Sequence, residues 1–76
     1  MKKFIKQIIG NVSNSKENAD KLGDEESFRD IVLWDSFIEK HFLESLQALV
    51  KNPLDPDELK FAETINQVEE LLNEYS

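Results

Sequence analysis

Residues 35–51, DSFIEKHFLESLQALVK, place two polar residues directly before an apolar stripe with helical spacing. Apolar side chains that recur every three or four residues gather on one face of an α-helix. The stretch therefore predicts a helix from Ser36 to about Lys51. Its inner face comprises Phe42, Leu43, Leu46, Leu49 and Val50.

A polar cap explains the start of this stretch. Ser36 and Glu39 have the three-residue spacing of a capping box, in which two side chains satisfy unpaired N–H groups of the first turn. A Ser or Asp cap stabilises a helix by about 1 kcal/mol. Capping alone is thus a sufficient reason for the pair Asp35-Ser36, and a function of the hydroxyl needs further support.

The chain before this helix alternates between apolar and polar segments. The spacing over residues 2–13 predicts an amphipathic helix whose inner side is formed by Phe4, Ile5, Ile8, Ile9 and Val12. Residues 14–27 are polar and offer only Leu22 as an apolar anchor, so we expect a long surface loop. Apolar weight then returns with Phe28, Ile31, Val32, Leu33 and Trp34.

Two more helices are predicted at the C-terminal side. Asp55 and Pro56 supply a cap and a proline at the first helical position, with Glu58 three residues after the cap, and they open a short helix over about residues 56–62. Residues 64–67, TINQ, form another capping box before a last helix. The inner face of that helix comprises Ile65, Val68, Leu71, Leu72 and Tyr75.

These elements predict one all-α domain over residues 1–76, a small four-helix bundle with a long first loop and a short third helix. Hydrophobic residues make up 39% of the 76 residues, enough for one core but not for a deep pocket with a second layer of support. No cysteine is present, which excludes disulfides, thiolate metal sites and thiol catalysis by the chain itself. Length and composition weigh against an autonomous enzyme.

The charge is negative and unevenly distributed. The net charge is −7, and from Lys16 to Ser76 six basic residues stand against sixteen acidic ones, a local balance of −10. Such a surface repels phosphate backbones, so we expect no nucleic-acid partner. It favours basic protein surfaces instead, although acidic residues also serve simply to keep a small helical protein soluble.

The first ten residues, MKKFIKQIIG, begin like a signal peptide. Lys6 and Gln7 interrupt the apolar segment, and no small-residue cleavage site follows. No stretch reaches the length of a membrane span. We therefore expect a cytoplasmic protein without membrane insertion.

Catalysis by Ser36 is disfavoured by geometry. A nucleophilic serine needs a base, and His41 is the only histidine. Five residues along an α-helix turn the two side chains about 140° apart, so the imidazole does not reach the hydroxyl. Metal binding is disfavoured too, because Asp55, Asp57 and Glu58 lack the spacing of a calcium loop. If Ser36 has a function, it is that of an acceptor which another enzyme modifies.

Several motifs in register now show a family resemblance. Asp35-Ser36-Phe37 is similar to the Asp-Ser-Leu motif of acyl carrier proteins, small acidic four-helix proteins that bear 4′-phosphopantetheine on that serine. Residues 8–10, IIG, resemble the end of the family's first helix, and residues 27–30, SFRD, resemble the stretch before the modified serine. Leu46, Leu54 and the pair Thr64-Ile65 also fall at the family's positions. The resemblance spans the whole chain.

The resemblance implies a non-catalytic, monomeric carrier of acyl-carrier fold. A phosphopantetheinyl transferase would attach the arm to Ser36, with Asp35 in its recognition motif, and a ligase, synthase or acyltransferase would load the arm as a thioester. The implied partner contacts are Phe37, Ile38, Glu39, Lys40 and Glu44. The implied acyl pocket comprises Phe28, Phe42, Leu46, Leu54, Phe61, Ala62 and Ile65, and for each of these residues plain core packing is the favoured sole role.

The chain also departs from the family. Leu33 stands where the family usually has glycine, with Trp34 beside it, and Lys40 and Glu44 replace apolar partner contacts. These changes indicate a carrier for a specialised acyl or aminoacyl group rather than for ordinary fatty acids. The alternative from another class is a small acidic adaptor in which Ser36 only caps a helix.

Overall fold

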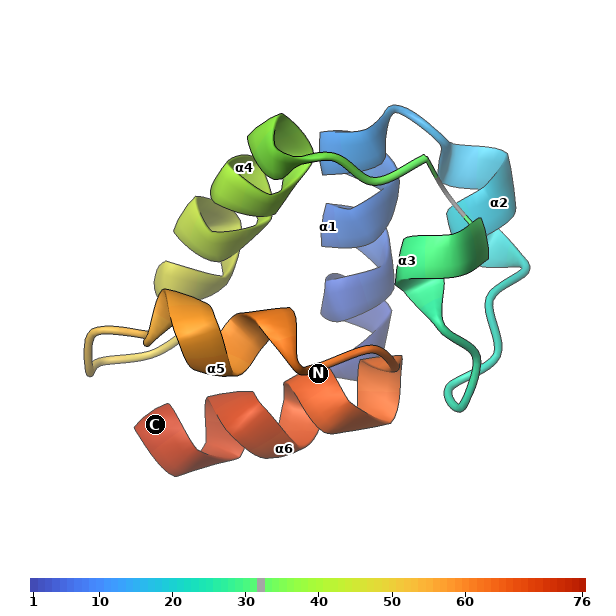
Figure 1. Ribbon diagram of the computed structural model, residues 1–76. Helices are drawn as coiled ribbons and strands as arrows, with labels where there is room; N and C mark the ends of the chain where they lie inside the picture. The colour runs from blue at the N-terminus through green and yellow to red at the C-terminus, as the bar shows by residue number, and fades with distance from the viewer. Residues whose placement is uncertain (32) are drawn as a thin grey trace.

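The computed structural model describes residues 1–31 and 33–76, and these residues form six helices (Figure 1). In chain order they are α1 Lys2–Ser13, α2 Lys16–Asp20, α3 Phe28–Ile31, α4 Ser36–Gln47, α5 Pro56–Lys60 and α6 Ile65–Tyr75. Within the described ranges no β-strand is present, and the only extended pairing there is an isolated antiparallel bridge between Ser27 and Thr64. The all-helical prediction is confirmed for these residues.

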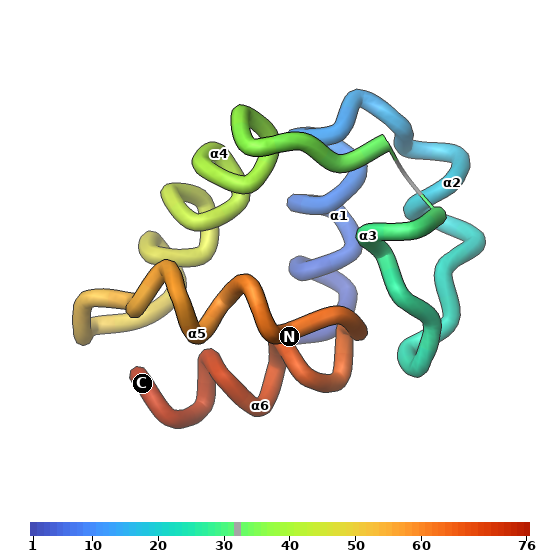
Figure 2. The backbone as a smooth tube through the Cα atoms, viewed as in Figure 1, coloured from blue at the N-terminus to red at the C-terminus, as the bar shows by residue number. Residues whose placement is uncertain are grey.

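Helix α1 is the element around which the others gather. It packs against α2, α4 and α6, and α5 packs against α6. Figure 1 shows α4 on one side of α1 and α2 with α3 on the other, while α5 and α6 lie together at the base. The backbone trace in Figure 2 shows how the segment after α4 turns back so that α5 and α6 close the structure. Helix α4 is thus supported by α1, which is itself packed against α2 and α6.

A single hydrophobic core lies between these helices. Its buried members come from all six helices and from three of the connections, and each is at most 6% exposed. They are Ile5, Ile9, Ala19, Leu22, Phe28, Phe42, Leu46, Leu54, Leu59, Ala62, Ile65, Val68 and Leu72. Burial of this apolar surface is the main force that holds such short helices together, because helices of this length are marginal in isolation.

The predicted helix over residues 2–13 is confirmed, but its inner face differs at one position. Ile5 and Ile9 are fully buried, whereas Phe4 is 57% exposed. Neighbouring residues on a helix point about 100° apart, so Ile5 can face the core while Phe4 faces outward. The inclusion of Phe4 in the inner face was wrong.

Helix α4 ends earlier than the pattern predicts. It stops at Gln47 rather than Lys51, and Leu49, expected inside, is 40% exposed. The Gln47 side chain explains the stop, since its Nε2 donates to the carbonyl of Asn52 at 2.9 Å and its Oε1 accepts the N–H of Leu54 at 2.7 Å. These contacts stabilise a turn where the apolar spacing by itself would continue the helix.

The prediction of a loop over residues 14–27 was wrong, because this segment contains α2. Ala19 on α2 is buried against α1 at Gly10, where an added Cβ would lie 3.3 Å from the Ala19 Cβ. The missing side chain at Gly10 lets the two helices approach closely. One buried alanine makes no periodic apolar pattern, so the sequence does not predict α2. A helix of this length is stabilised by its tertiary contact with α1.

The remaining differences concern the segment before α4 and the last two helices. The sequence pattern did not predict α3, and Val32, expected to add apolar weight there, lies outside the described residues. The caps of α5 and α6 are confirmed: Asp55 accepts the N–H of Asp57 at 2.9 Å, and Thr64 forms a complete capping box with Gln67. Local side-chain chemistry was sufficient to place these two helix starts.

Among the described residues, no helix combines the length and the apolar character needed to cross a membrane.

Candidate functional site at the start of helix α4

Asp35, not Ser36, is the residue that caps α4. Asp35 has an extended backbone, its Oδ1 accepts the N–H of Ile38 at 2.8 Å, and its carbonyl accepts the N–H of Glu39 at 3.0 Å. Ser36 is the first helical residue. The predicted capping box between Ser36 and Glu39 was therefore wrong, because the cap position needs a non-helical backbone and Asp35 takes it.

This shift by one residue leaves the Ser36 hydroxyl accessible. Ser36 is exposed, and its hydroxyl makes no hydrogen bond with any described residue. The N–H of Phe37, in the first turn, likewise has no partner among residues 1–31 and 33–76. An exposed hydroxyl beside an unpaired N–H at the positive end of a helix is a favourable place for an anionic group.

His41 has other neighbours than Ser36. Its ring lies edge-on to the Phe37 ring, with 4.6 Å between centroids, and its Nδ1 lies 3.8 Å from Oε1 of Glu44. The His41 side chain is half exposed. The structure thus agrees with the sequence geometry that keeps this imidazole away from Ser36.

Glu39 lies behind the site and is engaged within the molecule. Its Oε1 accepts hydrogen bonds from Nη1 of Arg29 and, at 2.7 Å, from Nε1 of Trp34. Only 17% of the Glu39 side chain and 18% of the Arg29 side chain are exposed. The resemblance implied Glu39 as a partner contact, but its carboxylate here has two internal partners.

Arg29 joins three parts of the molecule. Besides Glu39 on α4, its guanidinium donates to the carbonyls of Leu59 at 2.8 Å and Ala62 at 3.0 Å, at the end of α5 and just beyond it. Because one guanidinium carries five N–H donors in a planar fork, it can satisfy all three acceptors at once. We call Arg29, Trp34 and Glu39 the clasp.

Sequence reasoning missed the clasp. Arg29 stands 10 residues before Glu39 and 30 and 33 residues before its carbonyl partners. No local motif encodes such separations. The sequence shows only that an arginine follows Phe28 and that a tryptophan precedes the cap residue Asp35. Neither position indicates which residue the side chain will bind.

The other implied partner contacts differ in exposure. Phe37 is 68% exposed, and Lys40 and Glu44 are exposed, whereas Ile38 is half-buried. Phe37, Lys40 and Glu44 therefore form the accessible part of the α4 surface near Ser36.

Most residues of the implied acyl pocket belong to the core. Phe28, Phe42, Leu46, Leu54, Ala62 and Ile65 are buried there. Phe61 is 83% exposed, so its assignment to an interior pocket was wrong. Phe61 follows the last residue of α5, where the turn toward α6 directs its side chain outward.

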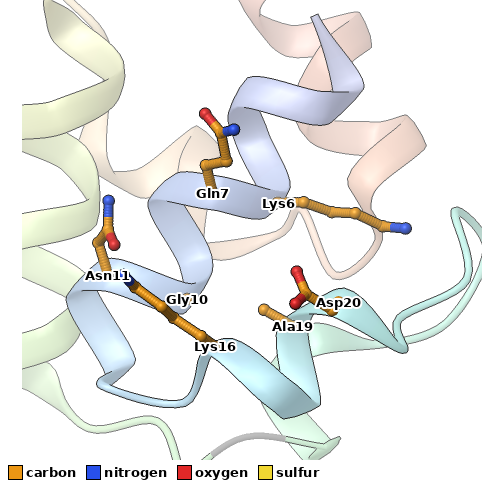
Figure 3. A pocket seen from close by; sticks show the side chains of 7 residues that line it. All are labelled: Lys6, Gln7, Gly10, Asn11, Lys16, Ala19 and Asp20. Atoms are coloured by element: carbon orange, nitrogen blue, oxygen red, sulfur yellow. The ribbon is translucent and has the colours of Figure 1, made fainter.

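Two surface pockets lie away from Ser36. One, of about 330 Å³, lies between α1 and α2 and is shown in Figure 3. Its lining is mostly polar: Lys6, Gln7, Gly10, Asn11, Lys16, Ala19 and Asp20. The other, of about 190 Å³, lies between α5 and α6 and is lined by Glu58, Phe61, Ala62, Gln67, Glu70, Leu71 and Glu74. Neither pocket is lined by residues of α4.

Across residues 1–31 and 33–76, no cluster of histidine or acidic side chains has the arrangement of a metal site.

Comparison with protein-family models finds no match, and comparisons with curated proteins and with solved structures find none at the level that would support a relationship. The site therefore has to be interpreted from its own geometry.

Proposed function

We propose that this protein is a carrier that holds an acyl or aminoacyl group as a thioester on a 4′-phosphopantetheine arm attached to Ser36. The observation that carries the proposal is the placement of this hydroxyl: exposed, first in α4, and directly after an Asp that caps the helix. Asp35 and Ser36 here have the order and helical position that the acyl-carrier resemblance requires.

The attachment step is chemically simple for the carrier. The Ser36 oxygen forms a phosphodiester bond with the phosphorus that carries the pantetheine, the pyrophosphate P–O bond of coenzyme A breaks, and 3′,5′-ADP leaves. The hydroxyl proton passes to a base on the transferase. The chain itself needs to supply only an accessible oxygen and a site that tolerates negative charge, which the start of α4 offers.

The absence of sulfur nucleophiles in the chain fits this division of labour. The sequence has no cysteine, and the His41 ring contacts Phe37 and Glu44. In a carrier the thiol that forms the thioester belongs to the cofactor, while the protein presents it to enzymes. A ligase, synthase or acyltransferase would then load and unload the arm.

In this proposal α1, α4, α5 and α6 correspond to the four helices of the acyl-carrier fold, with α2 and α3 formed inside the first connection. The enzymes would dock on the α4 surface around Ser36, where Phe37 offers apolar area and Lys40 and Glu44 offer opposite charges. A surface with both positive and negative groups is complementary to different partner surfaces from those that a uniformly acidic surface would bind. This mixture supports a specialised pathway rather than ordinary fatty-acid synthesis.

An intact-mass measurement tests the proposal. The purified protein is incubated with coenzyme A, Mg²⁺ and a broad-specificity phosphopantetheinyl transferase. We expect the mass to rise by one phosphopantetheine group, and we expect no rise for Ser36→Ala. Ser45→Ala is the matched control, since Ser45 lies on the same helix about two and a half turns further on, and this variant should still be modified.

The opposite result is equally informative. If several transferases leave the wild-type mass unchanged while circular dichroism shows a folded protein, the carrier proposal fails. The better interpretation is then an acidic adaptor protein, in which Asp35 and Ser36 serve only to begin helix α4.

A further inference from the structure

Trp34 lies two residues before Ser36 and forms part of an aromatic triangle. Its ring centroid is 5.0 Å from that of Phe28 and 5.1 Å from that of Phe42, in edge-to-face arrangements. Phe28 and Phe42 complete the triangle with centroids 5.4 Å apart. Rings at these distances and angles are in favourable contact, so the space between α3 and the first half of α4 is filled by aromatic carbon.

The clasp fixes the outer side of this triangle. Trp34 donates its Nε1–H to Glu39 at 2.7 Å, and the Arg29 guanidinium lies 5.0 Å from the Phe28 centroid and 5.6 Å from the Trp34 centroid. A cation above aromatic faces adds attraction to the packing. The indole is therefore hydrogen-bonded through its nitrogen to Glu39, lies beneath the Arg29 guanidinium and packs against two buried rings.

Trp34, two residues before Ser36 in the chain, connects the attachment segment to the buried rings of Phe28 and Phe42. Phe28 and Phe42 are fully buried, and a densely packed interior has no room for an added alkyl chain unless its own side chains move. Neither of the two pockets described above adjoins α4: one is lined mostly by polar groups of α1 and α2, and the other has four acidic or amide side chains of α5 and α6 among its seven residues.

We infer that Trp34 determines cargo specificity by closing the interior beside the attachment serine, so that the protein carries short or polar acyl groups that stay outside the helices. This inference rests on the proposed carrier function and narrows its substrate class. Trp34, held by Arg29 and Glu39, then excludes long alkyl chains from the interior in addition to stabilising the fold.

The test uses arms that are already acylated. A broad-specificity transferase moves the whole acyl-phosphopantetheine from acetyl-, hexanoyl- or decanoyl-coenzyme A to Ser36, releasing 3′,5′-ADP and leaving the thioester intact. Intact mass confirms each product. Two properties are then compared across the three cargos: the melting temperature, and the rate at which hydroxylamine cleaves the thioester.

For the wild-type protein we expect no dependence on chain length. The three melting temperatures should agree to within about 2 °C, since burial of only one or two methylene groups would raise the melting temperature of a domain of this size by about 4–8 °C. Hydroxylamine should cleave all three thioesters at the same rate within about twofold, which is under 0.5 kcal/mol in activation free energy. A decanoyl form that melts clearly higher, or whose thioester is protected tenfold, overturns the inference.

Substitution of Trp34 should create the missing dependence. In Trp34→Ala the decanoyl form should melt higher than the acetyl form and its thioester should react more slowly, because the vacated space accepts the chain. Trp34→Leu serves the same purpose if the alanine variant does not fold. Phe4→Ala is the matched control: it removes an exposed aromatic side chain from α1, outside the proposed docking surface, and should leave the protein insensitive to chain length.

Each result leads to a decision. If the wild type and both Trp34 variants are all insensitive, Trp34 is not the determinant and the inference fails while the carrier function stands. If no acyl-coenzyme A yields a mass increase, the carrier function fails and the inference fails with it.

Discussion

The indole N–H of Trp34 donates a 2.7 Å hydrogen bond to the carboxylate of Glu39, five residues later and one turn into α4. This bond spans Ser36, so the residue proposed to bear the cofactor lies between two anchored side chains. Arg29 binds the same carboxylate and extends the connection to the end of α5. The clasp thereby connects α3 and α5 to the first turn of α4, where Ser36 lies.

Loss of the Glu39 carboxylate should destabilise the protein. Glu39→Ala leaves the largely buried donors of Arg29 and Trp34 without their acceptor, and we expect a decrease of about 1–3 kcal/mol in the free energy of unfolding. Urea denaturation followed by circular dichroism measures it. Glu44→Ala on the exposed face is the control and should change stability by less than about 0.5 kcal/mol. Equal effects of the two substitutions would contradict the clasp.

The cap of α4 can be assigned by a pair of alanine variants. Asp35→Ala should lower stability by about 1 kcal/mol, because the N–H of Ile38 loses its acceptor. Asp35→Asn should retain most of that stability, since its amide oxygen can accept the same bond. Ser36→Ala should be nearly neutral in the same denaturation experiment. A larger loss for Ser36→Ala than for Asp35→Ala would return the cap to Ser36.

The close approach of α1 and α2 should be sensitive to volume at Gly10. Gly10→Val should destabilise by about 1–3 kcal/mol, because the new side chain would overlap Ala19 and the backbone of Lys16, whose Cα lies 3.3 Å from an added Cβ. Asn11→Val introduces the same β-branched residue at the next, exposed position of the helix and is the control. If thermal denaturation shows no difference between the two valine variants, α2 does not pack on Gly10 as described.

Tyr75 should titrate at an unusually high pH. Loss of solvent around the partly buried ring, followed by the interaction of its hydroxyl with the negatively charged Glu58 carboxylate, raises its pKa above the ordinary value of 10.0. It is the only tyrosine, so tyrosinate absorbance reports it directly. Glu58→Gln should lower the midpoint of the titration, whereas Glu44→Gln should leave it unchanged.

The same shift has a consequence for stability. A pKa raised by folding means that the folded protein holds the phenolic proton more tightly than the unfolded chain does. The contribution of Tyr75 is therefore complete below pH 10 and is lost as the pH rises through the folded pKa. A midpoint at or below that of a free tyrosine peptide would show that the surroundings of Tyr75 are different from those described.

Local chemistry in the sequence was sufficient for several elements. The apolar spacing of α1 and the caps at Asp55 and Thr64 predict three helices with starts that the structure confirms. These predictions succeed because a capping side chain acts on N–H groups two or three residues away, and an amphipathic stripe repeats within one helix. The pair Asp35-Ser36 was likewise recognised as a helix start and as a candidate acceptor.

The residues that support the candidate site were beyond such reasoning. Either Asp35 or Ser36 can cap a helix, and only the extended backbone at Asp35 decides between them. The burial of Ala19, the exposure of Phe61 and the stop of α4 at Gln47 also depend on contacts between segments. A short-range pattern contains no information about which distant surface will cover a side chain.

The sequence by itself determined a small, acidic, cysteine-free helical chain with an exposed serine after an aspartate at a helix start. Only the tertiary structure decided that Arg29 donates to Glu39, Leu59 and Ala62, and that Trp34 packs against Phe28 and Phe42. The physical reason is range. Caps and amphipathic spacing act within about one or two turns, whereas a partly buried guanidinium and an aromatic triangle need partners that become neighbours only when the whole chain has folded.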